Sequence, residues 1–255
     1  MESTELQKIR RVAEALVSRR HGVALTGAGI SVDSGIPDFR SPGGLWERFD
    51  PMDYATIDAF RADPERVWAM LVELDHMLET ARPNPGHLGL ARLEEREVLD
   101  GIVTQNIDDL HQKAGARRVV EFHGNGSRLR CLGCDRVEPS SRVRELGMPP
   151  RCPGCSMILK PDVVFFGEAI PRVAMDGAME LLEGCQVMLA VGTSATVAPA
   201  SMLPVAAQRH GALLVEVNLK PTELTSACDV AIHGSASETL PLLADEVDRL
   251  LEVPS

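Results

Sequence analysis

The stretch Val23-Ala-Leu-Thr26 runs directly into Gly27-Ala-Gly29-Ile-Ser31 and decides the fold. An apolar run followed by a glycine pair predicts a buried strand that ends in a tight turn before a helix. Backbone N–H groups in such a turn are suited to bind a pyrophosphate at the start of the helix. Val32 stands where the third glycine of the full dinucleotide-binding pattern belongs, so a plain strand-to-helix turn explains the glycines equally well.

Short apolar runs alternate with segments of helical spacing along most of the chain, which predicts an α/β fold. We expect a Rossmann-like open parallel sheet with helices on both faces. The predicted strands are 23–26, 101–104, 119–122, 187–191, 213–217 and 230–232, and the predicted helices are 4–20, 64 to a break at 83–86, 171–182, 200–208 and 240–251.

Two insertions interrupt this alternation, and we expect them to form a smaller second part beside the sheet. They are a helical segment at about 41–85 and a cysteine-bearing segment at about 125–159. The large part would then comprise about 1–40, 86–124 and 160–255.

Four of the six cysteines form two pairs, Cys131-Leu-Gly-Cys134 and Cys152-Pro-Gly-Cys155, separated by seventeen residues. Two such turns complete a tetrahedron of sulfur atoms around Zn²⁺, whereas two unrelated pairs would share no site. Since four thiolates leave no position for water, the spacing predicts a structural zinc ribbon with four cysteine ligands.

The net charge of −11, from 26 Lys and Arg against 37 Asp and Glu, argues against a dedicated nucleic-acid or anionic-membrane binder. The apolar runs are too short to span a membrane, and the N-terminus Met-Glu-Ser-Thr-Glu-Leu-Gln-Lys lacks the apolar core of a secretion signal. We therefore expect a cytoplasmic protein. Residues 113–151 are locally basic, with nine Lys and Arg against four Asp and Glu. This is either a solvated face or a module beside an anionic partner.

Three more polar loops follow predicted strands: Thr104-Gln-Asn-Ile-Asp108, Gly192-Thr-Ser194 and Asn218. Ligands of open α/β sheets bind beyond the carboxyl ends of the strands. Together with the glycine turn, these loops favour a nucleotide crevice.

His123 directly follows the predicted strand at 119–122, which makes it a candidate general base near neutral pH. Asn106 and Asp108 lie two residues apart and would point the same way in an extended segment. Their side chains suit the binding of a water or ribose hydroxyl and of an amide NH2. The alternative is that they cap the following helix.

These segments together resemble the sirtuins, the NAD-dependent protein deacylases, over nearly the whole chain. The motifs that carry the resemblance occur in order: Gly27-Ala-Gly-Ile-Ser31, Ser34-Gly-Ile-Pro-Asp-Phe-Arg40, Thr104-Gln-Asn-Ile-Asp108, Phe122-His-Gly124, the four cysteines, Lys160-Pro-Asp-Val-Val-Phe-Phe-Gly-Glu168, Gly192-Thr-Ser194 and Asn218. The resemblance implies a Rossmann-like large domain and a small domain of zinc and helical modules, with NAD and the acyl-lysine meeting between them.

In the reaction that the resemblance implies, the acyl amide oxygen attacks the nicotinamide ribose, nicotinamide leaves, and the acyl group passes to ADP-ribose. His123 would deprotonate a ribose hydroxyl, Asn106 would orient ribose and water, and Arg40 would assist near the ribose-phosphate. Ile36, Ile107 and Asp108 would hold the carboxamide. The implied NAD-binding positions are Gly27, Ala28, Gly29, Ile30, Ile36, Asp38, Phe39, Arg40, Gln105, Asn106, Ile107, Asp108, Gly192, Thr193, Ser194, Asn218, Leu219 and Ala236.

The implied substrate contacts lie on two segments. An extended peptide would add as a strand along Val163, Val164, Phe165, Phe166 and Gly167, and Leu71 and Leu74 would line the acyl pocket.

These leucines mark a departure from one branch of the family. The branch that removes succinyl and malonyl groups carries Tyr-x-x-Arg where this chain has Leu71 and Leu74. Without a guanidinium, a buried acyl carboxylate would lose its hydration uncompensated. The chain is therefore expected to act on neutral acyl groups, acetyl or longer.

Three other functions fit parts of the sequence. The same NAD cleavage could transfer ADP-ribose to a protein, and the fold could serve a non-catalytic binder of NAD or acyl-lysine, which Asn106, Asp108 and His123 argue against. A nicotinamide dehydrogenase is disfavoured by Val32.

Overall fold

The computed structural model describes residues 3–37, 45–143 and 145–252. Six parallel strands form one sheet in the order β3-β2-β1-β7-β8-β9, so the predicted Rossmann-like sheet is confirmed. The order of the strands reverses between β1 and β7, and the loops that follow them form a crevice at such a point. The strands are β1 (Gly22–Thr26), β2 (Leu99–Thr104), β3 (Val119–Glu121), β7 (Val187–Val191), β8 (Leu213–Asn218) and β9 (Val230–His233).

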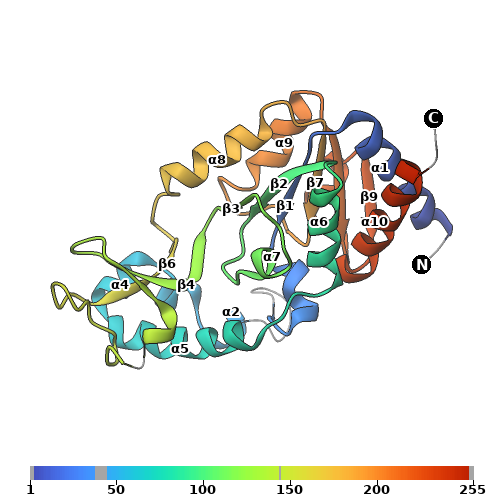
Figure 1. Cartoon of the computed structure of the whole chain (residues 1–255). Coiled ribbons are helices and arrows are strands. Elements are labelled where there is room, and N and C mark those ends of the chain that lie inside the picture. Colours follow the sequence, from blue (N-terminus) through green and yellow to red (C-terminus); the bar gives the residue numbers. More distant parts are fainter. Residues whose placement is uncertain (1–2, 38–44, 144, 253–255) are drawn as a thin grey trace.

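Helices cover both faces of this sheet (Figure 1). Successive residues of β1 alternate between two cores, with Ala24 in one and Val23 and Leu25 in the other. Both faces are thus dry, as the continuous apolar strand sequences predict. One core includes residues of α1 (Ser3–Arg19), α6 (Pro85–Glu95) and α10 (Ala236–Glu252), and the other includes residues of α8 (Arg172–Leu182) and α9 (Met202–Arg209).

Helix α6 differs from the prediction, in which residues 83–86 form only a break. Asn84 caps this helix by accepting hydrogen bonds from the backbone N–H groups of Gly86 and His87, and its own N–H donates to the His87 ring. Pro85 then occupies the first helical turn, where its missing N–H costs nothing. Helix α10 also begins earlier than predicted, at Ala236 rather than Leu240. Within the described residues, none of the helices combines the length and hydropathy needed to cross a membrane.

The two insertions pack together as one small unit, at the lower left of Figure 1. Trp68 is buried at its centre, and its indole N–H donates to the Leu159 carbonyl over 2.9 Å. The shared core joins Ile57, Phe60, Val67 and Leu71 of the helical insertion to Leu129, Leu159 and Val163 of the antiparallel sheet. The unit contains α2 (Leu45–Arg48), α3 (Pro51–Tyr54), α4 (Ile57–Ala62), α5 (Pro64–Thr80) and the sheet β5-β4-β6, formed by β5 (Val137–Pro139), β4 (Gly124–Cys131) and β6 (Leu159–Val163).

The four paired cysteines converge at one end of this unit, with their sulfur atoms all within 4.8 Å of one another. The backbone N–H groups of Gly133 and Gly154 approach the sulfur atoms of Cys131 and Cys152, each over 3.4 Å. Four soft sulfur ligands at this spacing suit tetrahedral Zn²⁺. The predicted zinc ribbon is therefore confirmed as a cluster fit for a structural metal.

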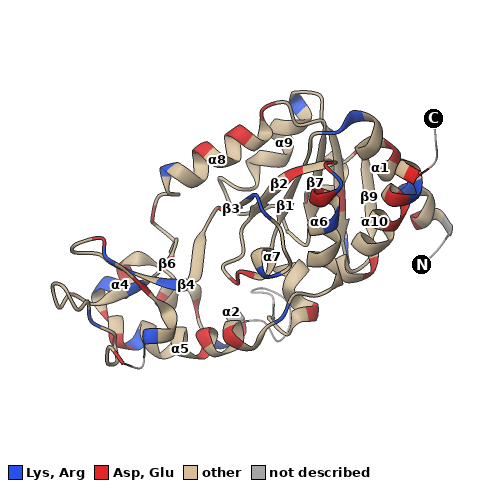
Figure 2. Cartoon of the chain, viewed as in Figure 1, with Lys and Arg blue, Asp and Glu red and all other residues tan. Residues whose placement is uncertain are grey.

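Several arginines of the basic stretch 113–151 form ion pairs within the molecule. Arg128 pairs with Glu121 and Asp162, and Glu138 receives both Arg136 and Arg142. Acidic and basic side chains are accordingly interspersed over the small unit (Figure 2). These pairs favour a solvated face over a docking site for a polyanion.

The loops that follow β1 and β7 are in direct backbone contact at the point where the strand order reverses. The Gly29 N–H donates to the Gly192 carbonyl over 2.8 Å. A Cβ on Gly29 would lie 2.8 Å from the Gly192 Cα, and a Cβ on Gly192, whose φ is +58°, would lie 2.4 Å from the Ile30 nitrogen. Glycine is required here because two backbones share the space that side chains would fill.

Replacing Gly192 by alanine should therefore cost more stability than conformational strain alone. We expect Gly192→Ala to lower the free energy of unfolding by about 2–4 kcal/mol, the sum of left-handed strain and overpacking. Gly211→Ala is the matched control, because Gly211 also has positive φ, +97°, but open space around its Cβ position. The control should lose only about 1 kcal/mol in chemical denaturation. Equal losses in the two variants would contradict the loop contact.

Removal of the metal should unfold the small unit. We expect one Zn²⁺ per chain, and a melting temperature that falls when the metal is chelated, because ligand binding energy is folding energy in such sites. Cys131→Ser should lose both the metal and the added stability, whereas Cys228→Ser, which lies outside the cluster, should keep both. Metal content and thermal unfolding test this together, and an unchanged melting temperature after complete chelation would contradict it.

Candidate active site

A cavity of about 1120 Å³ lies between the carboxyl ends of the large sheet and the small unit, because residues of both line it. Gly27, Asn106, Thr193 and Asn218 line it from the loops after β1, β2, β7 and β8. Trp68, Leu71 and Phe165 line it from the other side. The four polar loops that were expected to form a crevice therefore do meet at one place.

Most of the predicted site residues line this cavity. They are Gly27, Ala28, Gly29, Ile36, Gln105, Asn106, Ile107, Asp108, His123, Gly192, Thr193, Ser194, Asn218, Leu219 and Ala236, together with the substrate positions Leu71, Leu74, Val163, Val164, Phe165, Phe166 and Gly167. Ile30 is absent from the lining and is 1% exposed, since it packs in the sheet core. Asp38, Phe39 and Arg40 lie outside the described residues. The four cysteines lie away from the cavity, as a structural metal requires.

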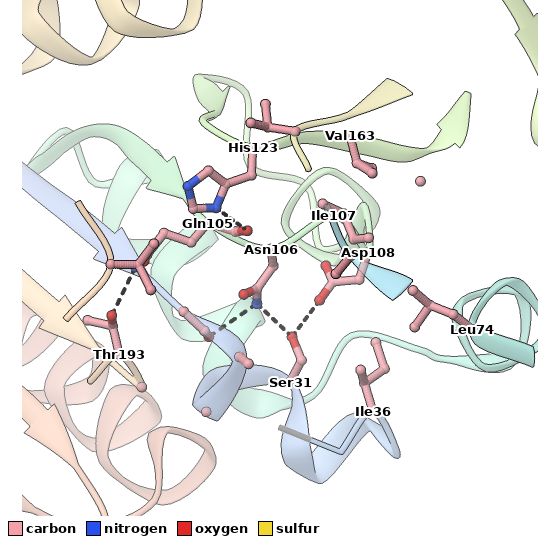
Figure 3. A pocket seen from close by; sticks show the side chains of 18 of the residues that line it. Ser31, Ile36, Leu74, Gln105, Asn106, Ile107, Asp108, His123, Val163 and Thr193 are labelled. Atoms are coloured by element: carbon pink, nitrogen blue, oxygen red, sulfur yellow. Dashed lines mark hydrogen bonds between the residues drawn. The ribbon is translucent and has the colours of Figure 1, made fainter. Parts of the chain in front are cut away.

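Ser31 joins two of the predicted residues (Figure 3). Its hydroxyl donates to Asp108 Oδ2 over 2.6 Å and accepts from Asn106 Nδ2 over 3.0 Å. Asn106 Nδ2 also donates to the Gly27 carbonyl over 3.1 Å. With its NH2 engaged twice, the Asn106 amide is held with its oxygen as the remaining acceptor. Ser31 is not among the predicted site residues, although its place in the glycine turn was a usable signal.

Asn106 and Asp108 were expected to point the same way because they would lie on an extended segment. The structure shows no strand at these residues. Residues 105–107 lack regular secondary structure, and Ser31 draws both side chains to the same point. Asp108 also accepts a hydrogen bond from the Leu110 N–H over 2.9 Å at the start of α7 (Leu110–Lys113). Asp108 therefore contacts the start of α7 through one carboxylate oxygen and Ser31 through the other.

His123 lies in the turn between β3 and β4, with its Nδ1 3.1 Å from the Gln105 carbonyl oxygen. A carbonyl only accepts, so this contact places the ring proton on Nδ1 and leaves Nε2 as a free base. Burial lowers the pKa of His123, and the hydrogen bond to Gln105 opposes that shift. The imidazole is thus neutral at pH 7 and poised to accept a proton.

A second layer of buried histidines supports this arrangement from behind. The Asn84 N–H donates to His87 Nδ1, so the proton on His87 Nε2 faces Ser31 Oγ at 3.4 Å. His111 donates to Thr26, whose hydroxyl donates to Thr104, which in turn accepts the Asn106 N–H. Burial lowers the pKa of His87 to about 4 and that of His111 to about 3. Both rings are therefore neutral, and they add no charge beside Asp108.

The end of the cavity beside α5 is lined mainly by apolar side chains, together with Asp75 of the same helix. Leu71 is 5% exposed and Trp68 is 1% exposed, and Leu74 and Leu78 are half-buried on the same helix. The described lining of this end contains no arginine or lysine from α5. The apolar stripe of this helix therefore has two roles: it packs in the small unit and forms the wall of the cavity. Trp68, Met70 and Leu78 were not predicted as lining residues. On α5, residues that face the core and residues that face the cavity recur at the same helical spacing, so the sequence does not distinguish them.

Only the first residue of the predicted peptide edge belongs to a regular strand, because β6 ends at Val163. Phe166 forms an isolated bridge with Thr56, and Gly167 lies in a turn with a φ of +88°. The Val164 N–H donates to the His123 carbonyl over 2.9 Å, and the Phe166 N–H donates to the Ala55 carbonyl over 2.9 Å. The segment is therefore anchored on both sides of the cavity, directly beside His123.

Comparison with known proteins agrees with this site. The sequence profile of the Sir2 family matches residues 27–199. The NAD-dependent protein deacylase 2 of Pyrobaculum aerophilum is 48% identical over 240 residues, which cover 94% of this chain and 96% of the relative. The NAD-dependent protein deacetylase of Caldivirga maquilingensis is 44% identical over 246 residues, 95% of each chain.

Solved structures give the same result. A Sir2 homologue in complex with NAD superposes with a TM-score of 0.89 at 37% identity, covering 95% of this chain and 94% of the other. A Sir2 enzyme bound to a myristoylated histone peptide superposes with a TM-score of 0.80 at 37% identity, covering 96% and 98%. On its motifs, its fold and these matches, the chain belongs to the Sir2 family.

Proposed function

We propose that this chain is an NAD-dependent protein-lysine deacylase that transfers a neutral acyl group, acetyl or longer, from lysine to ADP-ribose with release of nicotinamide. The observation that carries the proposal is one cavity that joins a neutral His123, with Nε2 free, to an apolar wall of Leu71 and Leu74. Relatives over most of the chain bear the name of this activity, and similar structures hold NAD or an acylated peptide.

The crevice at the strand reversal is the place for NAD. The contact of Gly29 with Gly192 keeps side chains out of the crevice, and Asn218 is held at its rim by a hydrogen bond to the Thr193 carbonyl over 3.0 Å. NAD supplies a glycosidic bond that breaks to release nicotinamide and leaves ADP-ribose to accept the acyl group. The apolar walls exclude water, which otherwise competes for that position.

His123 is proposed as the general base. Its Nε2 would accept the proton of a ribose hydroxyl, and the Gln105 carbonyl would stabilise the imidazolium that results. Asn106 would orient the ribose and the attacking water through its side-chain oxygen. Ser31 and Gly27 already hold the amide in this orientation.

The nicotinamide carboxamide is proposed to bind at Asp108, Ile36 and Ile107. The Asp108 carboxylate has acceptor capacity for an amide NH2 beyond the bond from Ser31, and both isoleucines line the cavity. On the family pattern alone, Arg40 is proposed to assist near the ribose-phosphate, and Asp38 and Phe39 are proposed as further NAD-binding positions.

The substrate is proposed to be an acyl-lysine in an extended protein segment. The peptide would add along 163–167, and the acyl group would enter toward Leu71 and Leu74. ADP-ribosyl transfer to protein would use the same NAD cleavage but would leave this apolar wall without a role.

Loss of His123 tests the mechanism. We expect His123→Ala to lower kcat for deacylation by at least about 100-fold, the usual effect of removing a general base. His210→Ala is the matched control, because His210 makes the same kind of Nδ1 contact, to the Ala206 carbonyl at 2.8 Å, but is exposed and outside the cavity. Mass spectrometry of the acyl-peptide product separates acyl loss from gain of ADP-ribose. Gain of ADP-ribose by the peptide, or an unimpaired His123→Ala, would refute the proposal.

The pH profile should carry the same signature. The base works only when unprotonated, so kcat/KM falls as the pH drops through the pKa of His123. Since burial lowers that pKa, we expect the acidic limb below about 6.5, the ordinary value for histidine. An acidic limb centred above that value would disagree with the geometry.

Acyl preference tests the apolar wall. Acetyl- and longer fatty-acyl-lysine peptides should exceed the succinyl peptide in kcat/KM by at least about tenfold, because the carboxylate would be buried unpaired. The double variant Leu71→Tyr with Leu74→Arg supplies the missing cation and should lower the ratio of kcat/KM for the acetyl peptide to that for the succinyl peptide. Leu74→Met should leave this ratio unchanged. A wild-type preference for succinyl-lysine would rule out the assignment.

A further inference from the structure

An ion pair joins β6 to the end of the peptide edge: Lys160 is buried, whereas Glu168 is half-buried and lines the cavity. Lys160 in β6 has a side chain only 5% exposed, and its Nζ lies 3.0 Å from Glu168 Oε2. The same Nζ donates to the Val163 carbonyl and lies 4.4 Å from the centre of the Phe165 ring. These three contacts of the ammonium are all made to the segment 163–168.

Packing alone does not account for a lysine at this position. A buried ammonium loses its hydration, and an apolar side chain of similar volume commonly serves a core as well or better. What the pair adds is directional: one cation fixes a carbonyl, a carboxylate and a ring at three points. In some proteins a buried pair fixes one conformation of a segment without adding stability.

Glu168 completes the restraint from the other end of the segment. Its Oε2 also accepts the Phe165 N–H over 2.8 Å, and its own N–H donates to the Phe165 carbonyl over 3.0 Å. The turn that follows Phe165 is therefore closed by side chain and backbone together. Between Lys160 and Glu168, the chain is held at Val163 and at Phe165.

The segment so restrained contacts the proposed base as well as the substrate side. Val164 donates to the His123 carbonyl, and the backbone of Phe166 is hydrogen-bonded to Ala55 through its N–H and to Ile57 through its carbonyl. All residues of 163–167 line the cavity. Any shift of Phe165 would therefore change the edge along which a peptide backbone would pair.

We infer that Lys160 and Glu168 are positioning residues that hold 163–167 ready for the backbone of the acylated peptide. The inference rests on the proposed deacylase function and deepens it. We expect loss of the pair to weaken peptide binding and to change NAD binding little. The crevice between the loops after β1 and β7 is held by the Gly29–Gly192 contact, which does not involve the pair.

The test is steady-state kinetics of Lys160→Met with two substrates that carry the same acetyl-lysine. One is a peptide with flanking residues, and the other is acetyl-lysine blocked at both ends and without flanking residues. We expect KM for the peptide to rise about tenfold or more, the effect of losing one directed contact to a charged group. KM for NAD and KM for the blocked acetyl-lysine should change less than about threefold.

Lys8→Met is the matched control. Lys8 also joins a glutamate, Glu5 at 2.8 Å, and a backbone carbonyl, that of Ala231 at 2.7 Å, but it lies outside the cavity. This variant should leave all three KM values unchanged. Glu168→Gln keeps an acceptor for the Phe165 N–H, so its peptide KM should rise less than that of Lys160→Met.

The double variant Lys160→Met with Glu168→Gln tests whether the two residues act through the same segment. If both residues act through this segment, the fold-increase in peptide KM of the double variant should be smaller than the product of the fold-increases of the two single variants. Inactive wild type would refute the deacylase assignment itself. Active wild type with a Lys160→Met that changes only the melting temperature, or raises all three KM values alike, would refute the positioning role.

Discussion

Backbone contact between Gly29 and Gly192 is the constraint on which the site depends. It brings the loops after β1 and β7 together where the strand order reverses, and it sets the starting point of the turn that carries Ser31. Ser31 then places Asn106 and Asp108, which arrive from the loop after β2. Three separate strand ends are thus tied to one backbone contact. The glycines serve close packing of the protein against itself as much as space for a ligand.

Charge is used sparingly around this centre. His87 and His111 are neutral because they are buried, and they transmit hydrogen-bond direction without adding a field beside Asp108. The segment 163–168 is instead held by a charged pair, the Lys160 ammonium and the Glu168 carboxylate. A neutral histidine donates one hydrogen bond and accepts one in the plane of its ring, whereas an ammonium can donate to three partners at once. Each therefore suits its place, a hydrogen-bond relay in one case and a three-point restraint in the other.

Much of this was predictable from sequence, for identifiable reasons. Continuous apolar strands and the Cys131-to-Cys155 spacing are local patterns, so the parallel sheet and the metal cluster follow from them. Helix α6 was missed because Asn84, a cap, sits inside a proline-rich stretch that also signals a break. The role of Lys160 could not be predicted, because Glu168 reaches it through the turn after Phe165 and no sequence periodicity relates the two residues. Contacts between loops are set by tertiary packing, which single-sequence patterns do not encode.

The pairing of β1 has a consequence for folding during synthesis of the chain. Gly22 is registered against Val187, so one edge of β1 stays open until the ribosome has produced the second half of the sheet. The core of the small unit, by contrast, needs nothing beyond Phe165. During synthesis the apolar wall that contains Leu71 can thus form before the crevice between the loops after β1 and β7. The exposed flank of β1 in that interval is where a nascent chain is most open to wrong pairing, and where a chaperone has most to protect.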